Sequence, residues 1–237
     1  MKSSWGRDAP NFGDVLAPVL IKRLLGVTPE WSNEGPRLLT VGSIIGHSLP
    51  GDTIWGSGYH PSNDTKGWRA TDKTFLAVRG PRTRKFVIDR GGSCPEIYGD
   101  PALLLPTIHP LAPIPTRPLA ILPHLDDDTG WQFGHARGIP TINPGWPWER
   151  VVQEICSSAH VVSSSLHGLI VAEAYGVPVT WAAFIKRPGK VEDYFAGVGR
   201  DAPQPLPWPE AVKQQPAASQ QPAPPDLLPA LLEWHQA

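Results

Sequence analysis

Short apolar segments alternate with helix-like segments along most of the chain, and this alternation restricts the fold more than any other feature of the sequence. Two strands that are joined by a helix usually lie parallel, because the helix carries the chain back to the starting edge of the sheet. The pattern therefore predicts an α/β protein with parallel sheets. We expect strands at residues 37–45, 53–55, 74–78, 96–98, 119–122, 138–142, 160–163 and 177–181, and helices at residues 15–25, 81–90, 151–158 and 168–175.

A run of prolines between Pro106 and Pro118 interrupts this pattern and predicts a linker. We therefore expect two Rossmann-like units, an N-terminal one at residues 1–110 and a C-terminal one at residues 111–200. Ligands of open α/β sheets bind at the carboxyl ends of the strands. A cleft between the two units is therefore the expected binding site.

Proline accounts for 29 of the 237 residues, and it is concentrated in the C-terminal segment 201–237. Proline has no backbone N–H and a fixed φ, so this segment cannot continue a helix or a central strand. It predicts an extended proline-rich tail that closes with a short helix at residues 226–234, with Asp226 as the N-cap.

Composition excludes several classes of protein. The formal net charge is -1, which disfavours a nucleic-acid partner or a basic membrane-surface helix. The two cysteines, Cys94 and Cys156, are too few for a disulfide framework or a metal cluster and indicate a reducing compartment. The first residues lack the apolar core of a signal peptide, and no apolar run approaches the roughly 20 residues of a membrane span. We expect a cytoplasmic protein.

Three serines and a histidine follow an apolar strand in the segment VVSSSLHGLI at residues 161–170. A helix N-terminus exposes free N–H groups and favours anions, and the hydroxyls of Ser163, Ser164 and Ser165 would add donors. A histidine at this turn, His167, could deliver a proton to a bound anion. The competing interpretation is that one serine caps the helix and His167 is structural.

Cations gather at the start of another expected helix, in VRGPRTRK at residues 78–85. Arg82, Arg84 and Lys85 would lie in its first turn, where positive charge opposes the helix dipole. A bound phosphate or carboxylate would explain them. Arg79 stands at the carboxyl end of the strand, so we expect its side chain to point into the cleft, while Arg84 and Lys85 are better read as solvated.

Further polar residues stand at strand ends or helix starts. Asp14 in NFGD is either an N-cap or a carboxylate that orients or deprotonates a sugar hydroxyl. Asp100 is a candidate partner of Arg79. Gly56 and Ser57 could bring backbone N–H groups close to a ligand. His124 is a candidate for the cleft wall.

An acidic run at residues 126–128 is similar to metal-binding runs of nucleotide-sugar transferases, but such runs are more often solvated loops. No ligand set has the spacing of a metal site, so we predict no metal requirement.

Five of these segments, in this order, resemble the polysaccharide pyruvyl transferase family. They are NFGD at residues 11–14, WGSG at 55–58, AVRGPRT at 77–83, YGDPALLLP at 98–106 and SSSLHGLIVAEAYGVPV at 163–179. Three stretches, AVRGPRTR, RPLAILPHL and SSSLHGLIVAEAYG, are most similar to the branch that pyruvylates terminal sugars of xanthan-like exopolysaccharides. The resemblance covers about residues 10–200 and implies a GT-B-like fold with an interdomain cleft, here with trimmed domains.

The resemblance implies that phosphoenolpyruvate is the donor, that no further cofactor is used, and that a sugar with two suitable hydroxyls receives a pyruvate ketal. It implies that His167 is the essential acid and Arg79 an anion clamp. Asp14, with the neighbouring Asn11, is the candidate base or acceptor orienter, and Arg187 a second anion clamp. A lipid-linked oligosaccharide as acceptor would place the protein at the inner face of the cell membrane.

Two other functions stay open at this point. AEAYGVPV at residues 172–179 resembles the segment where GT-B nucleotide-sugar glycosyltransferases hold the ribose with a glutamate, here Glu173. The arginine-rich turn and the histidine suit a small dianion better. The third possibility is a non-catalytic sugar-binding relative.

Overall fold

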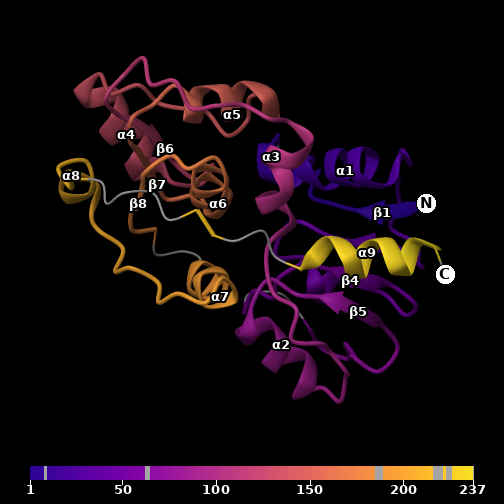
Figure 1. Cartoon of the computed structure of the whole chain (residues 1–237). Coiled ribbons are helices and arrows are strands. Elements are labelled where there is room, and N and C mark those ends of the chain that lie inside the picture. The colour runs from indigo at the N-terminus through magenta and orange to yellow at the C-terminus, as the bar shows by residue number, and fades with distance from the viewer. Residues whose placement is uncertain (8–9, 62–64, 185–188, 216–220, 223–225, 237) are drawn as a thin grey trace.

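The structure, a computed structural model, describes residues 1–7, 10–61, 65–184, 189–215, 221–222 and 226–236. These residues form two parallel β-sheets surrounded by helices (Figure 1), which confirms the predicted α/β class. The larger sheet has the strand order β2-β1-β3-β4-β5. Its strands are β1 (Lys2–Ser4), β2 (Glu30–Trp31), β3 (Leu38–Leu39), β4 (Thr53–Trp55) and β5 (Thr74–Ala77).

The smaller sheet has the order β6-β7-β8, with strands β6 (Ala120–Leu122), β7 (Val161–Ser163) and β8 (Val179–Trp181). Helix α6 (Leu166–Ala174) connects β7 to β8, as the parallel pairing requires. Every residue of β6 and β7 is buried, because helices cover both faces of the sheet.

Capping residues fix the ends of the first helix, α1 (Phe12–Leu25). The side chain of Asn11 accepts a hydrogen bond from the Gly13 N–H and is the N-cap, so the reading of Asp14 as the N-cap is wrong. Gly26 ends the helix with φ 71°, the left-handed conformation that glycine adopts without a Cβ clash. The helix therefore begins earlier than its apolar periodicity indicated.

The remaining helices cover the sheets and connect them. They are α2 (Pro81–Ile88), α3 (Leu105–Ile108), α4 (Asp128–Arg137), α5 (Trp148–Cys156), α7 (Lys190–Gly197), α8 (Trp208–Ala211) and α9 (Leu227–Gln236), with the 3-10 turns η1 (Ile45–His47) and η2 (Pro101–Leu104).

Several expected elements differ from the structure. The strands expected at 96–98 and 138–142 are reduced to single bridges, Val78 with Tyr98 and Ile121 with Thr141. Among the helices and strands, β1, β2, α3, α4, α7 and α8 were not predicted from the sequence. The first two are too short to show a period, and α4 and α7 carry mixed polar and apolar residues that blur one.

The division at residue 110 stays a prediction, as does the GT-B-like arrangement. One buried apolar cluster contains Leu16 and Leu38 from the N-terminal part together with Val151 and Leu169 from the C-terminal part. The two sheets are thus joined by a shared core and not only by the proline-rich linker at residues 106–118.

The described parts of the segment 201–237 pack on the body of the protein. The Nε1 atom of Trp208 in α8 donates a hydrogen bond to Asp127 beside the smaller sheet, at 3.2 Å. The Nε1 atom of Trp55 in β4 donates to the Leu227 carbonyl of α9, at 2.8 Å. In Figure 1, α8 therefore lies beside the smaller sheet and α9 beside the larger one, and α9 corresponds to the short helix expected at residues 226–234.

Cys94 and Cys156 are both free and buried. Among the helices of the described residues, none combines the length and the apolar character that crossing a membrane would demand.

Candidate active site

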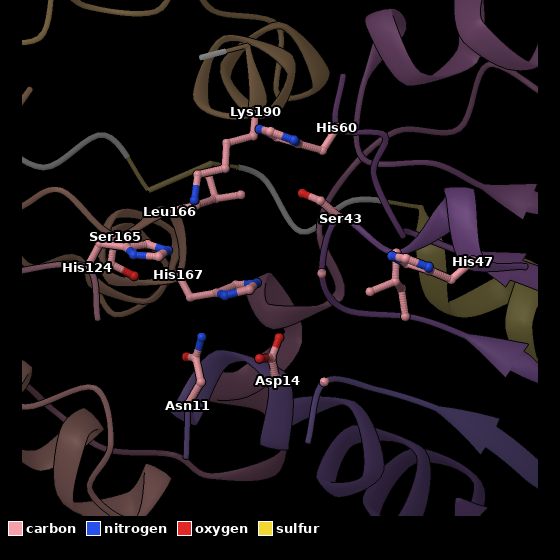
Figure 2. Close-up of a pocket in the computed structure, with 13 residues that line it drawn as sticks. Asn11, Asp14, Ser43, His47, His60, His124, Ser165, Leu166, His167 and Lys190 are labelled. Atoms are coloured by element: carbon pink, nitrogen blue, oxygen red, sulfur yellow. The ribbon is translucent and has the colours of Figure 1, made fainter. Parts of the chain in front are cut away.

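A pocket of about 330 Å³ lies where the carboxyl ends of the two sheets face each other (Figure 2). Gly6 follows β1, Ser43 follows β3, His124 follows β6 and Ser165 follows β7. This position agrees with the expectation for ligands of parallel sheets. The lining residues are Gly6, Asn11, Asp14, Gly42, Ser43, Ile44, His47, His60, His124, Ser165, Leu166, His167 and Lys190.

His167 is the central ionisable group of this pocket. It stands in the first turn of α6 and is 8% exposed, and in Figure 2 its ring points toward the part of the pocket that holds Asn11 and Asp14. The ring lies against Gly13, where a Cβ would collide with Nδ1, and makes an edge contact with Phe12. The absence of a side chain at position 13 is therefore what leaves room for the imidazole.

The three serines before His167 have three different roles. The Ser163 hydroxyl donates to the Leu122 carbonyl and accepts from the Ser165 N–H, so it joins β6 to the turn. The Ser164 hydroxyl donates to Asp127 at 2.6 Å and accepts from the His124 N–H. Ser165 is the N-cap residue of α6 and lines the pocket. Of the three serines, only Ser165 lines the pocket, whereas Ser163 and Ser164 hold the turn in place.

One side of the pocket carries an acid and an amide from the start of α1. The Asp14 carboxylate lies near Gly6 and Gly42, at the ends of the β1 and β3 loops. The Asn11 side chain caps the helix and also lines the pocket. Both were predicted site residues, and the structure brings them to the same pocket as His167.

The opposite side carries a lysine and two histidines. Lys190, the first residue of α7, extends into the pocket (Figure 2) although it is only 8% exposed. His60 is 5% exposed, and His124 stacks on Phe184 with ring centroids 4.9 Å apart. Among these, only His124 was predicted. No recognisable motif surrounds Lys190 or His60, so only the folded structure could reveal them.

Arg79 does not point into the pocket, contrary to the expectation. Its side chain is fully buried, and its Nε atom lies 3.2 Å from Oδ2 of Asp193 in α7. The guanidinium also donates to the Ser43 hydroxyl at 2.7 Å and to the Tyr59 carbonyl at 3.1 Å. Arg79 therefore supports the pocket from behind, through Ser43.

The anion expected at the cation-rich turn 78–85 is a carboxylate of the protein itself, that of Asp193. Oδ1 of Asp193 accepts the backbone N–H groups of Arg82 and Thr83 at 2.9 and 3.1 Å, and Oδ2 accepts the Thr83 hydroxyl at 2.6 Å. The N-terminus of α2 is thus capped by a residue of α7. Lys85 forms an exposed pair with Asp89, as the solvated interpretation expects.

Gly56 and Ser57 do not line the pocket. Gly56 has φ 82° and lies against Pro101, where a Cβ would clash. The Ser57 hydroxyl donates to the Gly42 carbonyl at 2.9 Å and so holds the turn that carries Ser43. Their role in the structure is to support the pocket loop, not to present N–H groups to a ligand.

Asp100 is not the partner of Arg79. It is fully buried at the start of η2, where Oδ1 accepts the Ala102 N–H at 3.0 Å. Its Oδ2 atom lies 3.8 Å from Nε2 of His167.

Glu173 is buried away from the pocket lining. Its Oε2 atom accepts hydrogen bonds from the Tyr194 hydroxyl at 2.6 Å and from Arg200 at 2.7 Å. Burial, together with the nearby Glu173 charge, raises the pKa of Tyr194 well above its ordinary value, so the phenol stays a donor. The glutamate is therefore committed to the packing of α6 against α7.

Asp127 of the acidic run is a structural residue. Its Oδ1 atom accepts the Gly130 N–H as the N-cap of α4, and its Oδ2 atom accepts from Ser164 and Trp208. Within the described part of the chain, no three His, Cys, Asp or Glu side chains are grouped to hold a metal ion. The prediction of no metal requirement stays a prediction. Arg187 lies outside the described residues.

Comparisons with known proteins agree with the sequence motifs. The model of the family described as polysaccharide pyruvyl transferase matches residues 44–183. Succinoglycan biosynthesis protein ExoV of Rhizobium meliloti (strain 1021) is 31% identical over 194 residues, which cover 74% of this chain and 57% of that relative. The chain thus spans little more than half the length of this curated relative. No solved structure matches the chain significantly.

Proposed function

Because the chain belongs to the polysaccharide pyruvyl transferase family, we propose that its pocket transfers the pyruvyl group of phosphoenolpyruvate to two hydroxyls of a sugar during exopolysaccharide biosynthesis. The observation that carries the proposal is the arrangement around His167. A lysine and two histidines lie on one side of this residue, and a carboxylate lies on the other.

The donor is a small, highly charged anion with a carboxylate and a phosphate. Lys190, His60 and His124 offer cationic or N–H donor groups along the pocket, and the first turn of α6 adds N–H groups beside Ser165. These groups replace Arg79 as the donor clamp that we favour, because they line the pocket and Arg79 does not. Arg187, twenty residues after His167 in the sequence, remains a proposed second clamp, although its local sequence departs from the family pattern.

His167 acts as the acid. Its imidazolium gives a proton to the methylene carbon of the enol, which becomes a methyl group and leaves a cation at the adjacent carbon that carries the phosphate. The first sugar hydroxyl attacks this carbon. A histidine suits the step because it can exchange protons near neutral pH.

Asp14 acts as the base or orients the acceptor on the other side of the pocket. It accepts the proton of the attacking hydroxyl while the first carbon–oxygen bond forms. The phosphate then leaves with its oxygen, and the second hydroxyl adds to the resulting cation. One hydroxyl proton replaces the proton that His167 gave, and the other leaves with the phosphate, so atoms and charges balance without a redox partner.

The glycosyltransferase alternative loses its main support in the structure. It requires Glu173 to hold a ribose, but this carboxylate is buried and bonded to Tyr194 and Arg200.

The deciding experiment measures phosphate release from phosphoenolpyruvate with a panel of galactosides, glucosides and mannosides, free and lipid-linked. Mass spectrometry of the sugar should show the added pyruvate ketal. Titrations with phosphoenolpyruvate and with nucleotide sugars run in parallel. Binding of a nucleotide sugar alone would favour the glycosyltransferase, and binding of neither would favour a non-catalytic relative.

A further inference from the structure

Two buried polar atoms face each other behind the candidate pocket. Oδ2 of Asp100 and Nε2 of His167 are 3.8 Å apart, and neither atom has a hydrogen-bond partner within the described part of the chain. A buried polar atom without a partner is rare, because burial removes its water. Two such atoms at this separation indicate a hydrogen bond between Asp100 and His167 that is not fully formed in the structure.

Their surroundings hold both groups in place. The other carboxylate oxygen of Asp100 is fixed by the Ala102 N–H at 3.0 Å, and the residue is fully buried. On the histidine side, Gly13 and Phe12 confine the ring. The separation exceeds a normal hydrogen bond, but such bonds in ligand-free sites are often long and shorten when the substrate binds.

We propose that Asp100 is the positioning residue of His167. Its Oδ2 atom accepts the Nε2 proton, so Nδ1 is the nitrogen that gives the proton to the donor. This inference rests on the proposed function for its effect on turnover, but the position of the proton can be measured without any reaction.

The fixed geometry makes Asp100→Asn a sharp test. The Ala102 N–H requires an acceptor, so the amide oxygen must take the place of Oδ1 and the NH₂ group must take the place of Oδ2. The NH₂ group then faces Nε2 as a donor. This arrangement favours the opposite tautomer, with the proton on Nδ1, and opposes the doubly protonated ring that the acid step needs.

The measurement is ¹⁵N NMR of protein labelled on its histidine side chains, with His167→Gln used to assign the signal. In the wild-type protein we expect the neutral His167 ring to carry its proton on Nε2, and in Asp100→Asn on Nδ1. With phosphoenolpyruvate and an accepted sugar, kcat should fall by about 10²–10⁴-fold, while the KM for the donor changes less than threefold. A proton on Nδ1 in the wild type would overturn the proposal.

A second variant covers the case in which Asp100→Asn does not fold. Asp100→Ser keeps an oxygen that can cap η2 but removes the atom that faces His167. We expect it to fold and to show a reduced share of the Nε2 tautomer. An unchanged tautomer in either folded variant would overturn the positioning role, whether or not the protein transfers pyruvate. The expected tautomer change without any turnover in the wild type would instead count against the proposed function alone.

Discussion

Arg79 and Asp193, 114 positions apart in the sequence, form a buried ion pair in which Nε lies 3.2 Å from Oδ2. The same carboxylate caps α2 through the N–H groups of Arg82 and Thr83. Asp193 stands in the first turn of α7, three positions after Lys190. The pair therefore fixes the helix from which Lys190 enters the pocket.

The first prediction is that Arg79→Ala and Asp193→Ala each lower the free energy of unfolding by about 3–5 kcal/mol, because each leaves one buried charge without its partner. Urea denaturation followed by circular dichroism measures the change. Lys85→Ala is the control, since its pair with Asp89 is exposed and should contribute less than about 1 kcal/mol. Wild-type stability in Arg79→Ala, combined with weak donor binding, would restore Arg79 as a direct clamp.

The sequence predicted the parts of the fold and site that depend on local pattern. Apolar runs identified β4 and β7 to within a residue, and SSSLHG placed His167 at the start of a helix. Ser165 and His167 could be assigned to the pocket because strand ends of a parallel sheet meet at one edge.

The parts that failed depend on contacts between distant segments. No sequence feature near Arg79 indicates that Asp193 is its partner. The sequence therefore predicted a bound anion beside Arg79, whereas the structure has the carboxylate of Asp193 there. In the same way, His60 and Lys190 reach the pocket only because the two sheets face each other. Asn11 rather than Asp14 caps α1, because the helix already begins at Phe12 and Asp14 lies inside its first turn.

The second prediction concerns donor affinity. Lys190→Ala should raise the KM for phosphoenolpyruvate by about 10- to 100-fold, which is the range expected for losing a hydrogen bond to a charged group. Turnover at saturating donor should change less. Steady-state phosphate release measures both values, and Lys22→Ala, on the exposed side of α1, is the matched control. An unchanged KM would show that the donor does not reach the start of α7.

The third prediction tests whether the proline-rich segment belongs to the folded body. Leu231 of α9 is fully buried in the shared core, whereas its neighbour Leu232 is only partly buried. Leu231→Ala should lower the free energy of unfolding by about 2–5 kcal/mol, as for other buried leucines. Leu232→Ala should cost clearly less. Equal small effects in urea denaturation would show that α9 does not pack on the body in solution.

The fourth prediction is a pH dependence of stability that arises from His160. Burial lowers the pKa of this histidine below its ordinary value of 6.5, and its Nε2 atom lies 2.9 Å from the Thr180 hydroxyl. The unfolded chain therefore takes up the proton first as the pH falls below 6.5. Each further pH unit should favour unfolding by at most about 1.4 kcal/mol, until the lower pKa of the folded state is reached.

His160→Gln should flatten this loss of stability between pH 7 and pH 5, because glutamine can keep a hydrogen bond to Thr180 but does not titrate. Urea denaturation at several pH values gives the slopes, and the same substitution at the exposed His135 is the control. If the slope of His160→Gln equalled that of the wild type, burial would not lower the pKa of His160 in the folded protein.

The last prediction separates a catalytic His167 from a structural one. An amide can donate a hydrogen bond but cannot transfer a proton at neutral pH, so His167→Gln should lower kcat by about 10²–10⁴-fold. The ring is confined by Gly13 and Phe12 and glutamine has a similar length, so the variant should fold. Donor affinity should change less than in Lys190→Ala, because the proposed site binds the charge of the donor through Lys190 rather than through His167. Circular dichroism, donor titration and turnover at saturating donor are compared on the same sample. A structural His167 predicts the reverse pattern, an unstable protein whose folded molecules turn over at the wild-type rate, and that result would remove the acid from the mechanism.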